Sequence, residues 1–399
     1  MSVSPNHGRR PIPTLSLTIP SLHDGTPLDC RLYHPSSLQD RSTSSSDAHS
    51  FHWRGDAAVI AHPYALMGGC YDDALVEAIV VQLLEAGFLV GTFNFRGAAH
   101  SAGKTSWTAK PEREDYASFV AFLAHYATRI QDPPRDAILL MSGYSYGAMV
   151  TTQLAPLESL LEPLVAPSPG SNAAEIRLRA EQLALQAGMT KSTSPVGVKR
   201  FGGGDQRRRK SCDGASFFSE HHHSRLPRSV CDLFAARTRP RHHQQHERGR
   251  RRRMTRFSVN DDDDDDNEEK TRAKSAPAPM TPAFPSRRLR AAYLLVSPLQ
   301  GLASRLATLS SSSSSSTMTA NNLTTNPSLA IYAGRDALVP AAKVRSWAAR
   351  LAAAPGSRFR ALEVARAGHF WTEAGALAEV EAAVACFASG LRSQSDGIS

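Results

Sequence analysis

A serine, an aspartate and a histidine, each following an apolar run, are the residues whose types and order could perform covalent chemistry in this chain. Ser145 lies in the sequence G-Y-S-Y-G, Asp336 in G-R-D-A-L-V-P and His369 in A-G-H-F-W. A serine hydroxyl needs a base to take its proton, and that base needs a carboxylate to orient it. The three residues together predict attack by Ser145 on a carbonyl, with His369 as the base and Asp336 as its orienting acid.

The setting of Ser145 is more informative than its G-x-S-x-G pattern alone. Five apolar residues, 137–141, precede the pattern and predict a buried strand, and the small or apolar residues 148–150 can begin a helix. A sharp turn between the two would lift the hydroxyl clear of the sheet, and bulk at either glycine would collide with neighbouring backbone. The alternative interpretation is a Gly/Ser turn without chemistry.

Two backbone N–H groups should face the negative charge that develops on the carbonyl oxygen. Tyr146 supplies one, because it follows the nucleophile at the positive end of a helix. The loop 62–69 should supply the other. Pro63 has no N–H, so Tyr64 is the candidate in that loop.

Four other charged or titratable residues could serve either the site or the fold. Glu373 and Asp115 are weaker candidates for the orienting acid. His62 precedes the nucleophile in a loop whose work is done by backbone, which favours a structural role. Arg96 is expected to brace the sheet edge, and contact with a substrate anion is the alternative.

A regular alternation of strands and helices surrounds these residues. Because helices separate most successive strands, the order predicts a mostly parallel sheet covered by helices on both faces. Asp336 and His369 then follow the carboxyl ends of strands, where such a sheet places its functional loops. Strands are predicted at 14–19, 27–34, 57–61, 88–95, 137–141, 289–297, 329–333 and 359–365, and helices at 74–86, 112–129, 172–188, 300–309, 341–353 and 372–391.

The charge of the chain is concentrated in one segment. Residues 199–274 hold 20 Lys and Arg against 13 Asp and Glu, so they carry +7 of the formal +9 and the remainder carries +2. Such a composition cannot bury enough apolar surface to offset the entropy of ordering. We therefore predict a disordered charged insertion at 189–286, solvated and partly charge-compensated. Contact of its Arg-rich run with nucleic acid is the alternative, and homopolymer runs are also typical of translated non-coding sequence.

The rest of the chain divides around that insertion. We expect flexible tails at 1–13 and 393–399. The folded core would comprise 14–155 and 287–392, and the residues between its first part and the insertion, 156–188, are a candidate helical lid.

The cysteines and the chain's apolar runs bear on compartment and cofactors. The five cysteines are odd in number and scattered, which favours reduced thiols in an intracellular protein. Histidines 221–223 with Cys212 and Cys231 do not have the spacing of a zinc site, so we expect no metal. The first residues lack the apolar core of a secretory signal, and no run of about 18 apolar residues occurs. We therefore predict a cytoplasmic protein without a membrane span.

Five short motifs occur in this order along the chain: H-P-x4-G-G, F-N-F-R-G, G-Y-S-Y-G, G-R-D-x-x-V-P and A-G-H-F-W. Together they resemble the α/β-hydrolase superfamily, and most of all its small serine-hydrolase branch near the dienelactone-hydrolase-like proteins. The resemblance covers roughly residues 14–160 and 288–392. It implies the α/β-hydrolase fold, with an eight-stranded, mostly parallel sheet. It also implies a triad of Ser145, His369 and Asp336, with backbone oxyanion donors at Tyr64 and Tyr146.

The chain departs from that pattern in two places. The loop after Arg96 reads G-A-A-H-S-A-G, where relatives usually have another glycine near Ala99. The insertion falls between the nucleophile helix and the next strand. Many relatives place a lid there, and this is the reason for considering 156–188 as a small helical cap.

The function predicted is a serine hydrolase that cleaves a carboxylic ester, thioester or amide of a small acyl substrate through an acyl-enzyme on Ser145. Neither a metal nor an organic cofactor is needed for this chemistry. The alternative is a non-catalytic scaffold on the same fold that binds a partner through the charged insertion.

Overall fold

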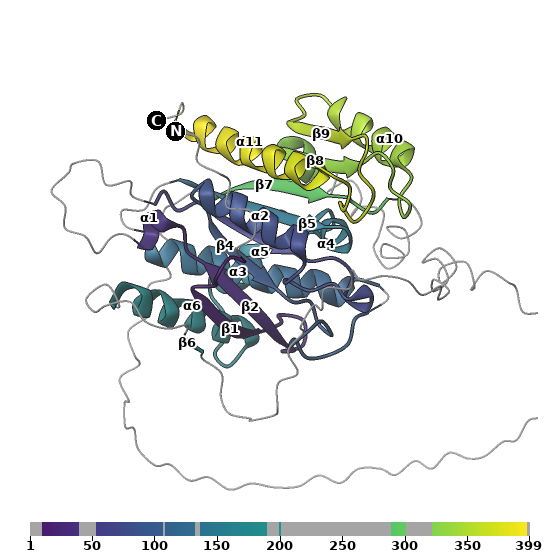
Figure 1. Ribbon diagram of the computed structural model, residues 1–399. Helices are drawn as coiled ribbons and strands as arrows, with labels where there is room; N and C mark the ends of the chain where they lie inside the picture. The colour runs from purple at the N-terminus through teal and green to yellow at the C-terminus, as the bar shows by residue number, and fades with distance from the viewer. Residues whose placement is uncertain are drawn as a thin grey trace, which may run out of the picture. The chain divides into compact units, whose positions relative to one another are not determined.

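A twisted sheet of nine strands lies at the centre of the described part of the chain, with helices packed around it (Figure 1). The computed structural model describes residues 10–39, 53–106, 108–131, 136–189, 199–200, 289–300 and 321–396. The chain divides into two units, Met1–His221 with Ala283–Ser399 and His222–Pro282, and every described residue lies in the first. Most of the predicted insertion and the predicted helix 300–309 lie outside the described residues.

The strands follow the order β6-β1-β2-β4-β3-β5-β7-β8-β9. The pairs β1–β2 and β2–β4 are antiparallel, and the remaining neighbours are parallel. The predicted mostly parallel, eight-stranded sheet is confirmed, and the two-residue strand β6 extends it at the β1 edge. The bounds are β1 (Leu15–Pro20), β2 (Pro27–Tyr33), β3 (Ala57–Ala61), β4 (Leu89–Phe93), β5 (Ala137–Tyr144), β6 (Lys199–Arg200), β7 (Leu289–Val296), β8 (Ser328–Ala333) and β9 (Phe359–Val364).

Helices cover both faces of the sheet, and the central strand β3 shows why its sequence is apolar throughout. All five of its residues are buried. Val59 packs in the core cluster beneath α3, and its neighbour Ile60 packs in the cluster beneath α2 and α11. Alternate residues of a strand point to opposite faces, so a strand covered on both sides has no polar position. Helices on both faces are therefore confirmed.

The helices form two layers, with α2 and α11 packed together on one face and α3 and α6 on the other (Figure 1). Asp73 caps α2, its carboxylate accepting the N–H groups of Leu75 and Val76. The bounds are α1 (Ser36–Gln39), η2 (Ala65–Met67), α2 (Ala74–Glu85), α3 (Lys110–Ile130), α4 (Tyr146–Thr151), α5 (Leu157–Leu161), η3 (Glu162–Leu164), α6 (Asn172–Met189), α10 (Ala341–Ala352) and α11 (Ala376–Asp396).

The candidate lid, 156–188, contains α5, η3 and α6. Helix α6 packs along α3 and β1. Its buried residues Ile176, Ala180 and Leu183 join the core cluster on the α3 face. The apolar stripe of this helix is thus buried against α3 and β1. A role of 156–188 as a lid stays a prediction.

Candidate active site

Ser145 occupies the turn between β5 and α4 in a backbone conformation that non-glycine residues rarely adopt. Its φ is 54° and its ψ is −109°. The turn is held by hydrogen bonds from the Ser145 N–H to the Val296 carbonyl, at 2.8 Å, and from the Met149 N–H to the Ser145 carbonyl, at 3.0 Å. Strain of this kind persists only where the surroundings enforce it, and it clusters at functional sites.

The two glycines of the turn are required by close backbone contacts. A Cβ added at Gly143 would lie 2.3 Å from the carbonyl carbon of Gly147. A Cβ added at Gly147 would lie 2.3 Å from the carbonyl oxygen of Ala61, at the end of β3. These contacts bring the turn against the start of the loop that contains Tyr64.

The structure brings Ser145, His369 and Asp336 together in one chain of hydrogen bonds. The Oγ of Ser145 lies 2.8 Å from Nε2 of His369. The Nδ1 of His369 lies 2.7 Å from Oδ2 of Asp336. The side chains of His369 and Asp336 are only 3% and 4% exposed, so solvent competes little for these bonds.

The second carboxylate oxygen of Asp336 fixes the orientation of the whole group. Its Oδ1 accepts the backbone N–H groups of Leu338 and Val339, both at 2.8 Å. A carboxylate accepts hydrogen bonds only, so the proton between Asp336 and His369 belongs to Nδ1 of the imidazole. We assign the proton from this network. It leaves Nε2 free to accept from the Ser145 hydroxyl.

The loop that carries His369 is anchored by three contacts that sequence reasoning did not predict. Tyr144, the residue before the nucleophile, donates its hydroxyl hydrogen to the carbonyl of His369 at 2.8 Å. The indole N–H of Trp371 donates to Oγ of Ser297 at 3.2 Å. Glu373 accepts the backbone N–H of Gly368, and this bond lowers the pKa of its carboxyl. Only the position of Tyr144 beside Ser145 could have drawn attention to it in the sequence.

The two residues predicted to supply the oxyanion donors pack against each other through their side chains. The rings of Tyr64 and Tyr146 pack with centroids 5.1 Å apart. Within the described residues, no hydrogen-bond acceptor is assigned to either backbone N–H. Their role as oxyanion donors stays a prediction.

His62 has a structural role that also orients the Tyr64 amide. Its Nδ1 lies 2.6 Å from the Pro63 carbonyl, and its Nε2 accepts the Phe95 N–H at 2.9 Å. Burial lowers the pKa of His62 to about 4, so the ring is neutral with its proton on Nδ1. In a trans peptide the C=O and N–H point in opposite directions. Because the Pro63 carbonyl faces His62, the Tyr64 N–H faces away from it.

The remaining charged candidates lie outside the Ser145–His369–Asp336 chain. Arg96 joins α3 to the turn between β1 and β2, because its guanidinium bonds to Asp115 at 2.6 Å and to Asp24 at 2.9 Å. The carboxylate of Asp115 therefore pairs with Arg96, and that of Glu373 accepts the Gly368 N–H, whereas Asp336 is the carboxylate that bonds to His369. Among the described residues, no group of three or more His, Cys, Asp or Glu is placed to hold a metal ion. The set at 212–231 lies outside those residues.

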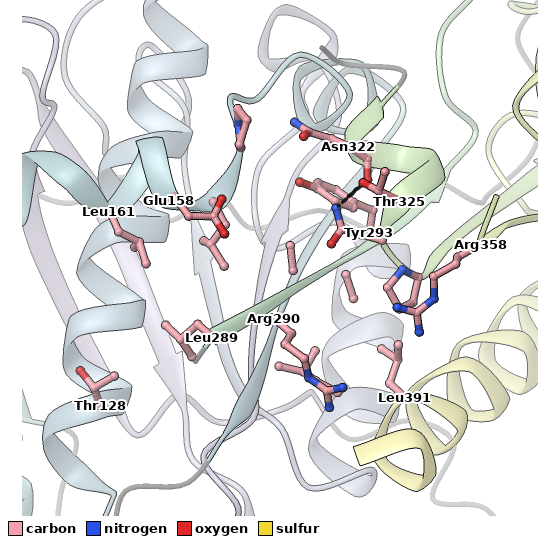
Figure 2. A pocket seen from close by; sticks show the side chains of 17 residues that line it. Thr128, Glu158, Leu161, Leu289, Arg290, Tyr293, Asn322, Thr325, Arg358 and Leu391 are labelled. Atoms are coloured by element: carbon pink, nitrogen blue, oxygen red, sulfur yellow. Dashed lines mark hydrogen bonds between the residues drawn. The ribbon is translucent and has the colours of Figure 1, made fainter. Parts of the chain in front are cut away.

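A cavity of about 670 Å³ lies at the opposite edge of the sheet. It is lined at the amino ends of β5, β7 and β8, by residues that include Ile138, Leu289 and Pro327. Figure 2 shows Tyr293, Asn322 and Thr325 gathered in one part of it and Arg290 and Leu391 in another. The candidate site lies at the carboxyl ends, so this cavity is not where a substrate of Ser145 would bind.

Comparison with known proteins identifies the family. A model of the family described as X-Pro dipeptidyl-peptidase (S15 family) matches residues 7–300. The α/β-hydrolase superfamily predicted from the motifs is confirmed; the narrower likeness to dienelactone-hydrolase-like proteins stays a prediction. The Schizosaccharomyces pombe protein "Uncharacterized protein C959.06c" is 34% identical over 96 residues, which are 24% of this chain and 37% of that protein. The match thus spans little more than a third of that relative.

Solved structures of low sequence identity align along most of the chain. An alpha-beta serine hydrolase homologue from Coxiella burnetii is 13% identical, with 94% of this chain and 97% of that chain covered and a TM-score of 0.44. XC6422 from Xanthomonas campestris, described as an a/b serine hydrolase without lid, is 14% identical, with 95% of this chain and 96% of that chain covered and a TM-score of 0.43.

None of the helices in the described ranges has the length and apolar character needed to cross a bilayer.

Proposed function

The chain belongs to the X-Pro dipeptidyl-peptidase (S15) family of α/β hydrolases, and from that premise we propose that it cleaves a carboxylic ester, thioester or amide through an acyl-enzyme on Ser145. The observation that carries the proposal is the hydrogen-bond chain from Ser145 Oγ through the His369 imidazole to Asp336, with distances of 2.8 and 2.7 Å. A small acyl compound is the proposed substrate. The cytoplasm is the proposed location, because the five cysteines are odd in number and scattered along the sequence, a pattern typical of reduced thiols.

In the proposed reaction, Oγ of Ser145 attacks the carbonyl carbon as its proton moves to Nε2 of His369. Asp336 holds the Nδ1–H side of the ring and stabilises the imidazolium that forms. The N–H groups of Tyr64 and Tyr146 bind the oxyanion. The bond to the leaving group then breaks, and the leaving group takes the proton from Nε2. A water molecule, activated by the same imidazole, hydrolyses the acyl-enzyme.

The conformation of Ser145 favours an enzyme over a scaffold on the same fold. Its φ of 54° belongs to a region that costs of order 1–3 kcal/mol for a non-glycine residue. A scaffold gains nothing from this cost. For a nucleophile it lifts the hydroxyl toward the imidazole, and the bonds to Val296 and Met149 maintain it.

A hydrolysis panel with a Ser145→Ala variant tests the proposal. The panel contains p-nitrophenyl esters from acetate to octanoate, an acyl thioester and glycyl-prolyl-p-nitroanilide, an amide of the kind named by the family. We expect turnover of at least one compound and its loss in Ser145→Ala, while Ser346→Ala, on the surface of α10, keeps wild-type rates. Turnover that survives in Ser145→Ala, with the fold intact by circular dichroism, would contradict the proposal.

A further inference from the structure

Phe370, the residue after His369, presents a large apolar side chain to solvent beside the candidate site. It is 61% exposed. Its ring centroid lies 5.4 Å from that of the His369 imidazole, and the two ring planes are nearly perpendicular, at 84°. An exposed apolar residue alone is ordinary on a protein surface. Phe370 is of interest because its ring is in edge-to-face contact with the imidazole of His369, the proposed base.

The backbone turn that carries this phenyl ring is held by hydrogen bonds within the protein. His369 and Phe370 are the two central residues of a turn closed by the Trp371 N–H and the Gly368 carbonyl at 3.2 Å. The turn is held on one side by Tyr144 and on the other by the indole of Trp371. A preformed surface of this kind contributes to binding without the entropic cost of ordering a loop.

The chemistry of the acylation step decides which part of a substrate meets Phe370. The leaving atom must take its proton from Nε2 of His369, so it lies within hydrogen-bond reach of the imidazole. A leaving group whose body continues from that atom along the same loop would meet the adjoining phenyl ring. The acyl oxygen is instead bound by the amides of Tyr64 and Tyr146 in the proposed reaction.

We propose that Phe370 forms a leaving-group subsite that favours alcohols, thiols or amines with an apolar and above all aromatic body. This inference rests on the proposed function of Ser145, and it specifies the leaving group of the substrate. Aromatic pairs in offset or edge-to-face contact gain affinity beyond the area they bury. The exposed face of the Phe370 ring offers such a contact to an incoming aryl group.

Two series of esters separate this subsite from acyl selectivity. In the first series, methyl, butyl and benzyl acetate share one acyl group and vary the leaving alcohol. In the second, p-nitrophenyl acetate, butyrate and octanoate share one leaving group and vary the acyl chain. The kcat/KM is compared, because it reports acylation, the step in which the leaving group is still present. All acetates pass through the same acetyl-enzyme, so their kcat values converge where deacylation limits.

In wild type we expect benzyl acetate to have a higher kcat/KM than methyl acetate. Phe370→Ala should lower the benzyl-to-methyl ratio about tenfold and leave the octanoate-to-acetate ratio unchanged. Phe370→Leu keeps an apolar side chain without the ring, and its benzyl-to-methyl ratio should lie between those of wild type and Phe370→Ala. Leu185→Ala, at a side chain 67% exposed on α6, is the matched control and should keep wild-type ratios.

An unchanged benzyl-to-methyl ratio in Phe370→Ala would overturn the inference, and so would an equal fall in both ratios. In both cases Ser145-dependent hydrolysis by wild type would leave the proposed function standing. Absence of Ser145-dependent hydrolysis of every ester in both series, and also of the acyl thioester and of glycyl-prolyl-p-nitroanilide, would instead overturn the proposed function, and the subsite with it.

Discussion

The hydroxyl of Tyr144 donates a 2.8 Å hydrogen bond to the carbonyl oxygen of His369. The two rings also stack, with centroids 5.9 Å apart and planes inclined by 30°. Tyr144 is the last residue of β5 and precedes Ser145, so the strand that delivers the nucleophile also holds the loop of the base. The separation between Oγ and Nε2 therefore depends on a residue that need not touch a substrate.

Replacing Tyr144 by phenylalanine should separate this positioning role from binding. The variant keeps the ring and leaves the buried carbonyl of His369 unsatisfied, which costs about 1–3 kcal/mol. We expect kcat on a p-nitrophenyl ester to fall about tenfold, with KM nearly unchanged. Tyr293→Phe is the control, because that buried hydroxyl has no assigned partner in the described part of the chain. Equal kcat values in the two variants would exclude the positioning role.

Asp336 and Glu373 should differ sharply in their effect on rate. Asp336 bonds to Nδ1 of His369, whereas Glu373 accepts a backbone N–H. Asp336→Asn can favour the wrong imidazole tautomer, and we expect kcat to fall by roughly 10³–10⁴-fold. Glu373→Gln should change kcat by no more than a few-fold. Steady-state kinetics of the two variants decides between them, and a greater loss from Glu373→Gln would reverse the assignment.

The buried His62 makes stability depend on pH. Its pKa is lowered from 6.5 to about 4 in the folded protein, with burial as the main cause. As pH falls from 6.5 to 4, the unfolded chain takes up a proton that the folded chain does not, so stability is lost over this window. His62 should account for roughly 2–3 kcal/mol between pH 7 and 4.5. His34, whose pKa burial also lowers to about 4, adds a loss of the same sign.

Urea unfolding at the two pH values measures this dependence. The free energy of unfolding should drop less between pH 7 and 4.5 in His62→Gln than in wild type, because Gln does not titrate. The comparison is between the two drops and is unaffected by an overall destabilisation of the variant. Identical drops would show that His62 is not the titrating group.

Ala99 adopts a left-handed backbone conformation, which glycine adopts at lower cost than alanine. Its φ is 45°. An L-residue with a Cβ pays about 1–2 kcal/mol there. Ala99→Gly should therefore stabilise the protein by roughly 0.5–1 kcal/mol, seen as a higher Tm. Ala102→Gly, at a nearby exposed alanine without positive φ, should lower the Tm; a lower Tm in both variants would mean that the loop carries no strain.

The sequence predicts those parts of the site that are encoded locally. The strand before Ser145, its two glycines and the loop positions of Asp336 and His369 each follow from a few neighbouring residues. Parallel strands then bring the three loops to one edge of the sheet. That is why the order Ser, Asp, His was sufficient to place the residues that the structure brings within hydrogen-bond distance.

The parts that were not predicted depend on contacts between distant residues. The bond from Tyr144 to His369 joins residues 225 positions apart, and nothing near either one signals it. The stripe on α6 predicts a buried face but not that its partner is α3. Helix α11 begins at Ala376, later than the predicted Thr372, because Trp371 and Gly375 adopt φ values of 57° and 80° that interrupt a helix.

The account depends most on Ser145 being a nucleophile activated by its neighbours. A fluorophosphonate probe, followed by proteolysis and mass spectrometry, measures this directly because it reacts with activated serines and needs no knowledge of the substrate. We expect one covalent adduct, mapped to the peptide that contains Ser145 and lost in Ser145→Ala and His369→Ala. A folded wild-type protein that carries no adduct, or carries it on another serine, would contradict the account.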